Sequence, residues 1–155
     1  MMKISTKSRY GVRLLLDMAS LYQKGPVNLT DVATRQGMSV KYLEQIIIPL
    51  KKAKYVTSLR GPKGGHMLAR PPEDITIGEI VALLEESASL VDCSDRPESC
   101  ERAGICLTRD VWQEAAKAMF DKLNSITLAD LLKKCPTQEN GQGESHVFTH
   151  RHGTF

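Results

Sequence analysis

The sequence lacks the features that mark membrane proteins, secreted proteins and the common enzymes. No apolar run approaches the roughly 18 residues that cross a bilayer, and the start of the chain has no apolar stretch typical of a secretory signal. It contains no glycine-rich phosphate loop, no serine–histidine–aspartate pattern and no histidine among residues 67–145. We therefore expect a cytoplasmic protein that is not an enzyme and has no membrane partner.

Acidic residues are scarce in the first part of the chain. Residues 1–70 contain 13 lysines and arginines but only 3 acidic residues, a net charge of +10, and residues 71–155 have a net charge of −7, which together give the +3 of the whole chain. A basic half joined to an acidic half favours a protein in which one half binds a polyanion. Two solvated faces of one domain are the alternative, but such faces would not follow chain order so cleanly.

Apolar spacing in the basic half predicts three helices, from residue 6 to about 24, over 30–36, and from 40 to about 54. Gly37 stands where a helix end favours glycine, Ser39 is the expected cap of the third helix, and Pro49 should bend that helix. Strand-like stretches at 55–59 and 66–69 enclose RGPKGG at 60–65, which suits a hairpin loop. The predicted fold class is mainly α with a small β-hairpin, a winged helix-turn-helix.

The acidic half predicts more helices around a cysteine-containing loop. A capping box at Thr76 and Glu79 opens a helix to about 86, residues 87–106 are an expected loop, a long helix covers 108–123, and a short helix follows Thr127. We divide the chain into a DNA-binding domain at 1–72, a region of loop and helices at 73–135, and a disordered polar tail at 136–155. The apolar side of the long helix comprises Val111, Trp112, Ala115, Met119 and Leu123.

The start of the third helix carries polar side chains, while its apolar residues fall on the other face. A recognition helix enters the major groove with this end, where glutamine pairs with adenine and glutamate accepts from cytosine. A basic wing suits the minor groove or phosphates, and basic residues near the first helix suit phosphates. A winged helix that binds protein is the alternative. The predicted contacts to double-stranded DNA are Ser39, Lys41, Tyr42, Glu44, Gln45, Arg60, Lys63, Lys3, Lys7 and Arg9.

Three of the four cysteines, Cys93, Cys100 and Cys106, follow a C-x6-C-x5-C spacing. Zinc sites usually have closer pairs, whereas three spaced thiolates on a loop suit an iron–sulfur cluster. Redox-active thiols and a structural zinc are the alternatives. We interpret Cys135 as a plain thiol, the nearby carboxylates as solvated, and the tail histidines 146, 150 and 152 as having no role.

The motifs SRYGV at 8–12, YLEQ at 42–45, RGPKGG at 60–65 and CLTRDVW at 106–112 carry a family resemblance. From about residue 2 to 132 the chain resembles the bacterial winged-helix transcription regulators that include IscR, NsrR and CymR, and it is most similar to the IscR type. The resemblance implies that Glu44 and Gln45 read bases and that Arg60 enters the minor groove. It also implies a 2Fe–2S cluster on the three cysteines and a homodimer formed through the long helix, which binds a two-fold symmetric site.

Two positions depart from this family. IscR-type members have a histidine ligand where this chain has Arg109, which has no lone pair to offer a metal, and the aspartate ligand of NsrR-type members is replaced by Arg9. The fourth ligand is therefore not predicted. The predicted function is a regulator that senses iron–sulfur cluster status and controls cluster biogenesis genes. The alternatives are a nitric oxide or redox sensor, and a cluster-free regulator that acts with a metabolic enzyme.

Overall fold

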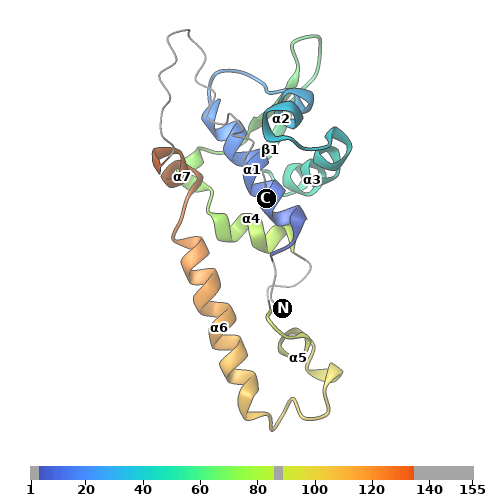
Figure 1. Cartoon of the computed structure of the whole chain (residues 1–155), viewed down its shortest axis with the longest axis vertical. Coiled ribbons are helices and arrows are strands. Elements are labelled where there is room, and N and C mark those ends of the chain that lie inside the picture. The colour runs from blue at the N-terminus through green and yellow to red at the C-terminus, as the bar shows by residue number, and fades with distance from the viewer. Residues whose placement is uncertain (1–3, 86–88, 135–155) are drawn as a thin grey trace, which may run out of the picture.

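The computed structural model describes residues 4–85 and 89–134. The predictions for Lys3, Cys135 and the tail at 136–155 lie outside these ranges. In chain order the elements are α1 (Thr6–Ser20), α2 (Leu29–Gln36), α3 (Val40–Lys52), β1 (Val56–Leu59), β2 (Gly65–Leu68), the 3-10 helix η1 (Pro72–Asp74), α4 (Ile77–Leu84), α5 (Asp92–Asp95), the 3-10 helix η2 (Pro97–Ser99), α6 (Leu107–Asn124) and α7 (Leu128–Lys134) (Figure 1).

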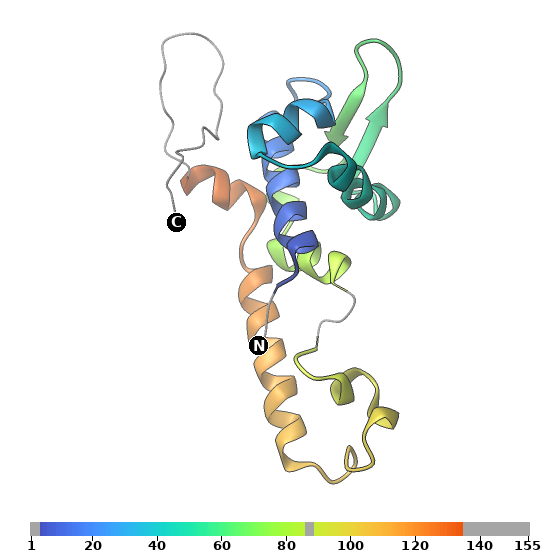
Figure 2. The same cartoon turned by 45° about the vertical axis from the view of Figure 1, so that its right-hand side comes forward.

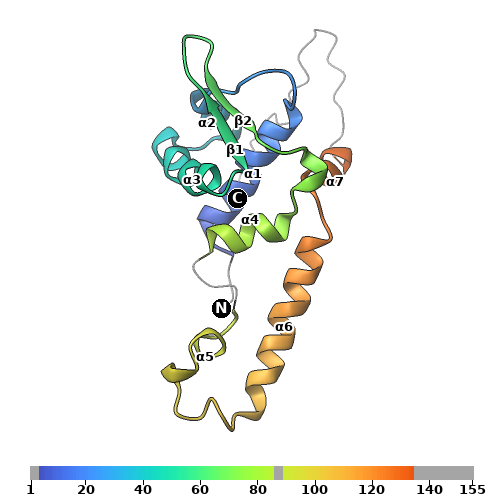
Figure 3. The same ribbon diagram turned by 180° about the vertical axis from the view of Figure 1, so that it is seen from behind.

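The predicted winged helix-turn-helix is confirmed. Helices α1, α2 and α3 are followed by β1 and β2, which pair antiparallel with Val56 opposite Leu68 and Leu59 opposite Gly65. Figure 3 shows this hairpin extending beyond the helices as a wing. The fold is mainly helical, and the hairpin is the one sheet within the described ranges.

The ends of α1 and α4 follow local hydrogen-bonding chemistry. The Ser5 hydroxyl accepts a hydrogen bond from the Ser8 backbone N–H at 3.1 Å, which caps α1. The predicted capping box is present, because the Thr76 hydroxyl accepts the Glu79 backbone N–H at 3.2 Å and the Glu79 carboxylate accepts the Thr76 N–H at 3.0 Å. Ser39 differs from expectation, since it takes the N-cap position of α3 without a side-chain capping bond.

Helix α1 ends at Ser20, earlier than the predicted 24. Gln23 and Gly25 have φ angles of 64° and 114°, which are outside the right-handed helical region and turn the chain towards α2. Gly37 ends α2 as predicted, with a left-handed φ of 62°. Pro49 lies inside α3, and its carbonyl still accepts the Ala53 N–H at 2.9 Å, so the last turn of α3 closes despite the proline.

Helix α1 is the centre of the core. Leu14 and Leu15 are fully buried, whereas Val12 and Leu16 are only partly buried. Helices α3, α4 and α7 all contact α1, so that it is covered from several sides rather than along one stripe. The core therefore includes elements from both the basic and the acidic parts of the chain.

Helices α4 and α7 are joined to this core at close range (Figure 1). A Cβ atom on Gly11 of α1 would collide with the Leu84 side chain of α4, so glycine allows the two helices to approach. A backbone bridge joins Thr76 to Thr127, and Leu128 at the start of α7 is fully buried. These contacts fix both ends of the segment that contains α5, η2 and α6.

Helix α6 extends away from the core, and the segment with α5 and η2 runs beside it (Figure 2). None of the residues of α6 is buried. The prediction of a loop over 87–106 is wrong in part, because residues 92–95 and 97–99 form the one-turn helices α5 and η2. Such short elements have no apolar periodicity that a sequence could reveal. None of the helices in the described ranges is long and apolar enough to cross a membrane.

A buried polar network joins α1 to α2. The Asp17 carboxylate, 2% exposed, accepts hydrogen bonds from Arg35 at 3.1 and 2.6 Å and from the Gln36 amide at 3.1 Å. Arg13 donates to the Gln36 side chain at 3.1 Å and to its backbone carbonyl at 2.5 Å. The hydrogen bonds to Asp17 raise the pKa of the Arg35 guanidinium. The network fixes α2 relative to α1.

Replacing Asp17 by alanine is expected to lower the free energy of unfolding by about 1–3 kcal/mol, because the buried Gln36 amide loses its acceptor. Urea unfolding followed by circular dichroism measures the change. The matched control is Asp121→Ala on α6, whose carboxylate pairs with Lys117 on an exposed helix face and contributes little to stability. Equal unfolding midpoints for the two variants would contradict the role of the network.

Candidate functional site

The exposed start of α3 carries most of the predicted DNA-reading residues. Ser39, Lys41, Glu44 and Gln45 are all exposed. Tyr42 is half-buried, and its ring packs edge-on against the Tyr10 ring with centroids 5.7 Å apart. The polar face predicted from the sequence is therefore present on α3, and Tyr42 also joins α3 to α1.

A groove of about 310 Å³ separates α3 from the wing. Glu44 borders it on the α3 side, and the glycines of the wing border it on the other side. The start of α2 contributes polar groups that the sequence prediction missed, although an asparagine before an apolar helix is a recognisable cap signal. The groove is lined by Asn28, Leu29, Thr30, Val40, Glu44, Leu59, Gly61, Gly64, Gly65 and His66.

The wing is held to the body of the fold through β2. His66 on β2 exchanges two backbone hydrogen bonds of 2.8 Å with Val27, and its Nδ1 lies 2.9 Å from the Ser58 hydroxyl on β1. Partial burial, together with the nearby Lys51, lowers the pKa of the His66 imidazole. Sequence reasoning placed His66 in a strand of the wing, but its backbone pairing with residue 27 could not be predicted, because that pairing depends on the tertiary fold.

The remaining predicted contacts lie on two different elements. Arg60 and Lys63 are exposed on the loop of the wing, between β1 and β2. Lys7 and Arg9 lie in the first turns of α1, where the Arg9 guanidinium donates to the Thr6 hydroxyl at 3.1 Å. Lys7 is half-buried, and its charge adds to the hydrogen bonds from Ser8 and Ser5 that lower the pKa of the Glu85 carboxyl.

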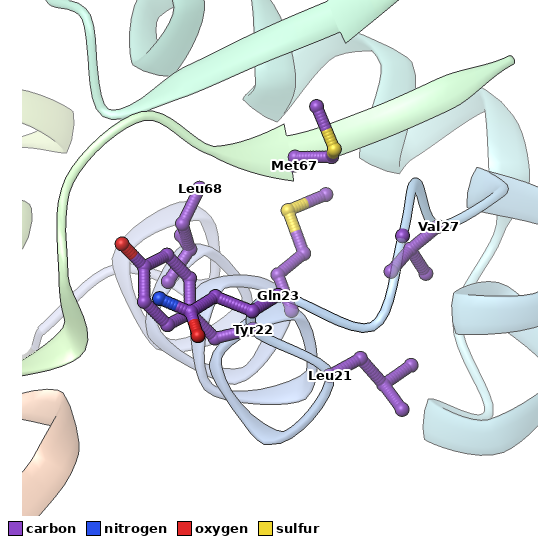
Figure 4. A pocket seen from close by; sticks show the side chains of 8 residues that line it. Leu21, Tyr22, Gln23, Val27, Met67 and Leu68 are labelled. Carbon is purple, nitrogen blue, oxygen red and sulfur yellow. The ribbon is translucent and has the colours of Figure 1, made fainter.

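A second pocket, of about 180 Å³, lies between the end of α1 and β2 (Figure 4). Its walls are apolar apart from Tyr22 and Gln23, and none of its lining residues is charged. It therefore offers no cation to a phosphate. The lining residues are Met18, Leu21, Tyr22, Gln23, Gly25, Val27, Met67 and Leu68.

The three clustered cysteines all lie on the segment between α4 and α6. Cys93 is on α5, Cys100 follows η2, and Cys106 is the N-cap of α6. Each is partly exposed and none forms a disulfide. The structure does not bring them into one site, since no three metal-ligating side chains within residues 4–85 and 89–134 are close enough to hold an ion.

Cys106 has the surroundings of a thiolate. Its sulfur lies 3.3 Å from the Thr108 hydroxyl, and it also accepts backbone hydrogen bonds from Thr108 and Arg109 in the first turn of α6. The Thr108 hydroxyl is the largest influence, and these bonds, together with the charge of Arg102, lower the pKa of the Cys106 thiol. The unpaired backbone N–H groups at the start of a helix also favour negative charge, which stabilises the thiolate.

Two polar atoms around these cysteines are buried without a hydrogen-bond partner. They are the Ser94 hydroxyl and Nε of Arg109. Buried polar atoms in native proteins are nearly always paired, so both sites can donate to a further group. Three free thiols on one segment are the donor type of a thiolate-bound iron–sulfur cluster, but the described residues do not hold the three together.

A helix-turn-helix followed by a β-hairpin wing defines a winged-helix DNA-binding protein. The family model described as "Iron-dependent Transcriptional regulator", named Rrf2, matches residues 4–134. The chain belongs to the Rrf2 family and is a DNA-binding transcriptional regulator rather than an enzyme.

Several relatives and solved structures are similar over most of the chain. It is 51% identical to Protein rrf2 of Nitratidesulfovibrio vulgaris over 87% of this chain and 92% of that protein. It is 41% identical to the regulator IscR of Vibrio atlanticus over 85% of this chain and 76% of that protein. The structure of T. potens IscR superposes with a TM-score of 0.72 at 41% identity, over 92% of this chain and 94% of that one. The structure of CymR of B. subtilis, described as a global cysteine regulator, gives a TM-score of 0.71 at 37% identity. The match covers 86% of this chain and 98% of that one.

Replacing Thr108 by alanine is expected to raise the pKa of the Cys106 thiol towards its ordinary value, because the largest stabilising hydrogen bond is lost. The thiolate fraction at neutral pH then falls, and alkylation slows there but not at alkaline pH. The alkylation rate of Cys106 is measured from neutral to alkaline pH by site-resolved mass spectrometry of iodoacetamide labelling. The protein is reduced and metal-free. Thr57→Val, an exposed change on the wing, is the control. Superimposable pH curves for Thr108→Ala and the unmodified protein would refute the effect.

Proposed function

We propose that this regulator senses iron–sulfur status through a 2Fe–2S cluster held by Cys93, Cys100 and Cys106, and that it controls genes of cluster biogenesis. The observation that carries the proposal is the presence of three free thiols on the one segment between α4 and α6. Thiolates are the usual protein ligands of such clusters. A bound cluster would be gained when iron is plentiful and lost when iron is scarce or oxidants are present. Its occupancy would therefore report iron–sulfur status.

The two ends of this segment support a physical connection to the DNA-binding helices. Glu85, at the end of α4, accepts the Ser5 N–H at the start of α1 at 2.8 Å. Burial alone would raise the pKa of the Glu85 carboxyl, but hydrogen bonds from Ser8 and Ser5 lower it. At the other end, Cys106 begins α6, and α6 contacts α4. A rearrangement of the cysteines is therefore transmitted to α1 through α4.

In this proposal α3 and the wing contact double-stranded DNA. Glu44 and Gln45 read base edges in the major groove, and Arg60 enters the minor groove. Exposure of all three side chains supports these roles. The residues proposed to position the protein on the duplex are Ser39, Lys41, Tyr42, Lys63, Lys7 and Arg9.

We also propose that α6 pairs with the α6 of a second copy. Leu107, Val111 and Trp112 are exposed by 91%, 55% and 43%, which is unusual for large apolar side chains on one helix. A two-fold dimer formed through this face would present two recognition helices to a symmetric DNA site.

Replacing Gln45 by alanine is expected to weaken DNA binding by about 1–3 kcal/mol and to flatten the base preference at one position of each half-site. Replacing Lys63 by alanine should weaken binding to all sequences and reduce the salt slope by about 1. Fluorescence anisotropy over a salt series, on a duplex selected by the unmodified protein from a random pool, measures both effects. Lys117→Ala, exposed on α6, is the control. Unchanged affinity and base preference in both variants would exclude this DNA-binding face.

Replacing Cys93 or Cys100 by alanine is expected to abolish cluster uptake. Protein purified without oxygen should contain iron and acid-labile sulfide and show sulfide-to-iron absorption in the visible range. Ser99→Ala, on the same segment, should retain the cluster. DNA affinity is then compared with and without the cluster, and a difference is expected. A protein that stays colourless after reconstitution with iron and sulfide would refute the cluster.

A redox or nitric oxide sensor is the second candidate, favoured by the lowered pKa of the Cys106 thiol. Thiolates are the form of cysteine that oxidants attack. If the protein takes up no cluster, loss of DNA binding on titration with peroxide or nitric oxide, absent in Cys106→Ala, would identify this function.

A further inference from the structure

One large apolar side chain is exposed on α3, every residue of which the structure describes. Ile48 is 65% exposed, whereas the neighbouring Ile46 and Ile47 are buried in the core. Single exposed apolar side chains are common on protein surfaces, so exposure alone assigns Ile48 no role. Its place on the helix is what distinguishes it.

Ile48 lies in the middle of the proposed base-reading face of α3. At about 100° per residue, it is about 40° around the helix from Glu44 on one side and about 60° from Gln45 on the other. Glu44 borders the groove towards the wing, and both of these side chains are exposed. Along the axis, Ile48 is one turn, about 6 Å, beyond Glu44, which is less than two base-pair steps of about 3.4 Å. Base reading by Glu44 and Gln45 therefore places Ile48 at the same groove, within two base pairs of them.

Basic side chains lie before and after Ile48 on the same helix. Lys41 is about two turns before it, and Lys51 and Lys52 are about one turn after it. All three lysines are exposed. Burial, and after it the charge of Lys51, lowers the pKa of the His66 imidazole on β2, so Lys51 is on the side of α3 that faces the wing. Cations suit phosphates, whereas an isoleucine gains nothing from them. The face thus offers charge to the DNA backbone and, between the charges, an apolar group to the base edges.

We propose, on the basis of the proposed DNA-binding face, that Ile48 is a specificity-determining residue that contacts the C5-methyl group of a thymine in the major groove. Thymine presents this apolar group at its major-groove edge, whereas the edges of the other three bases present polar atoms there. Contact with Ile48 removes the methyl group from water and favours thymine at one position for each recognition helix. That position lies one or two base pairs from those that Glu44 and Gln45 read.

The test replaces thymine by deoxyuridine, which differs at the major-groove edge only in lacking the methyl group. The full chain is titrated with a duplex that the unmodified protein selects from a random pool, in which each thymine is replaced in turn, and fluorescence anisotropy measures the affinity. We expect a loss of about three- to fivefold at one thymine for each recognition helix, the size expected for one buried methyl group.

Variants of the protein assign the effect to Ile48. Ile48→Ala should bind the thymine and deoxyuridine duplexes equally, and Ile48→Val should keep most of the difference. Ile4→Ala removes an isoleucine that is 40% exposed and lies outside α3, so it should keep the full difference. Thermal midpoints equal to that of the unmodified protein confirm that the variants fold. The comparison of duplexes with the unmodified protein needs no variant.

The outcomes distinguish this inference from the proposed DNA-binding face. If the base preference depends on Gln45 but every thymine tolerates deoxyuridine, or the selected duplex has no thymine within two base pairs of the position that Gln45 reads, the role of Ile48 is overturned while the face stands. A deoxyuridine effect of the same size in Ile48→Ala assigns the methyl group to another side chain and also overturns it. If Gln45→Ala and Lys63→Ala both leave binding unchanged, the face and the inference are overturned together.

Discussion

The position of α3, the proposed recognition helix, depends on one buried carboxylate. Asp17 lies on the central helix and ties α2 to α1 through Arg35 and Gln36. Helix α3 follows after a turn at Gly37, so its orientation is set by the helix before it and by the apolar contacts of Leu43. A charge removed from water is tolerated only when it is fully paired, and full pairing requires one arrangement of the three partners. The network therefore specifies geometry as well as stability.

The same central helix joins the two proposed functions of the chain. Its middle anchors α2 through Asp17, and at its start the Ser5 backbone N–H donates to the carboxylate of Glu85 at the end of α4. Because α4 leads into the cysteine segment and α6 returns from that segment to contact α4, any rearrangement there acts on a helix packed against α1. A packed core moves between discrete arrangements, so in the proposed dimer a small local change can alter how well the two α3 helices match their DNA.

Local patterns in the sequence predicted most of the fold. Apolar spacing, the glycine at 37, the Thr76 capping box and the glycine-rich wing loop gave every element except α5 and the 3-10 helices, with ends displaced by a few residues. The exposed polar face of α3 also followed from spacing. Local spacing could not reveal that α1 is covered on several sides by α3, α4 and α7, because that depends on residues distant in the chain.

The sequence by itself determined the fold class, the basic character of the DNA-binding half and the clustering of three thiols on one segment. Periodicity and composition are properties of neighbouring residues, so these features needed no tertiary information. Only the tertiary structure decided which polar groups are buried and what they contact. Asp17 reads as an ordinary helix aspartate. Burial and pairing with Arg35 and Gln36, which lie far from it in the chain, distinguish it from a surface charge.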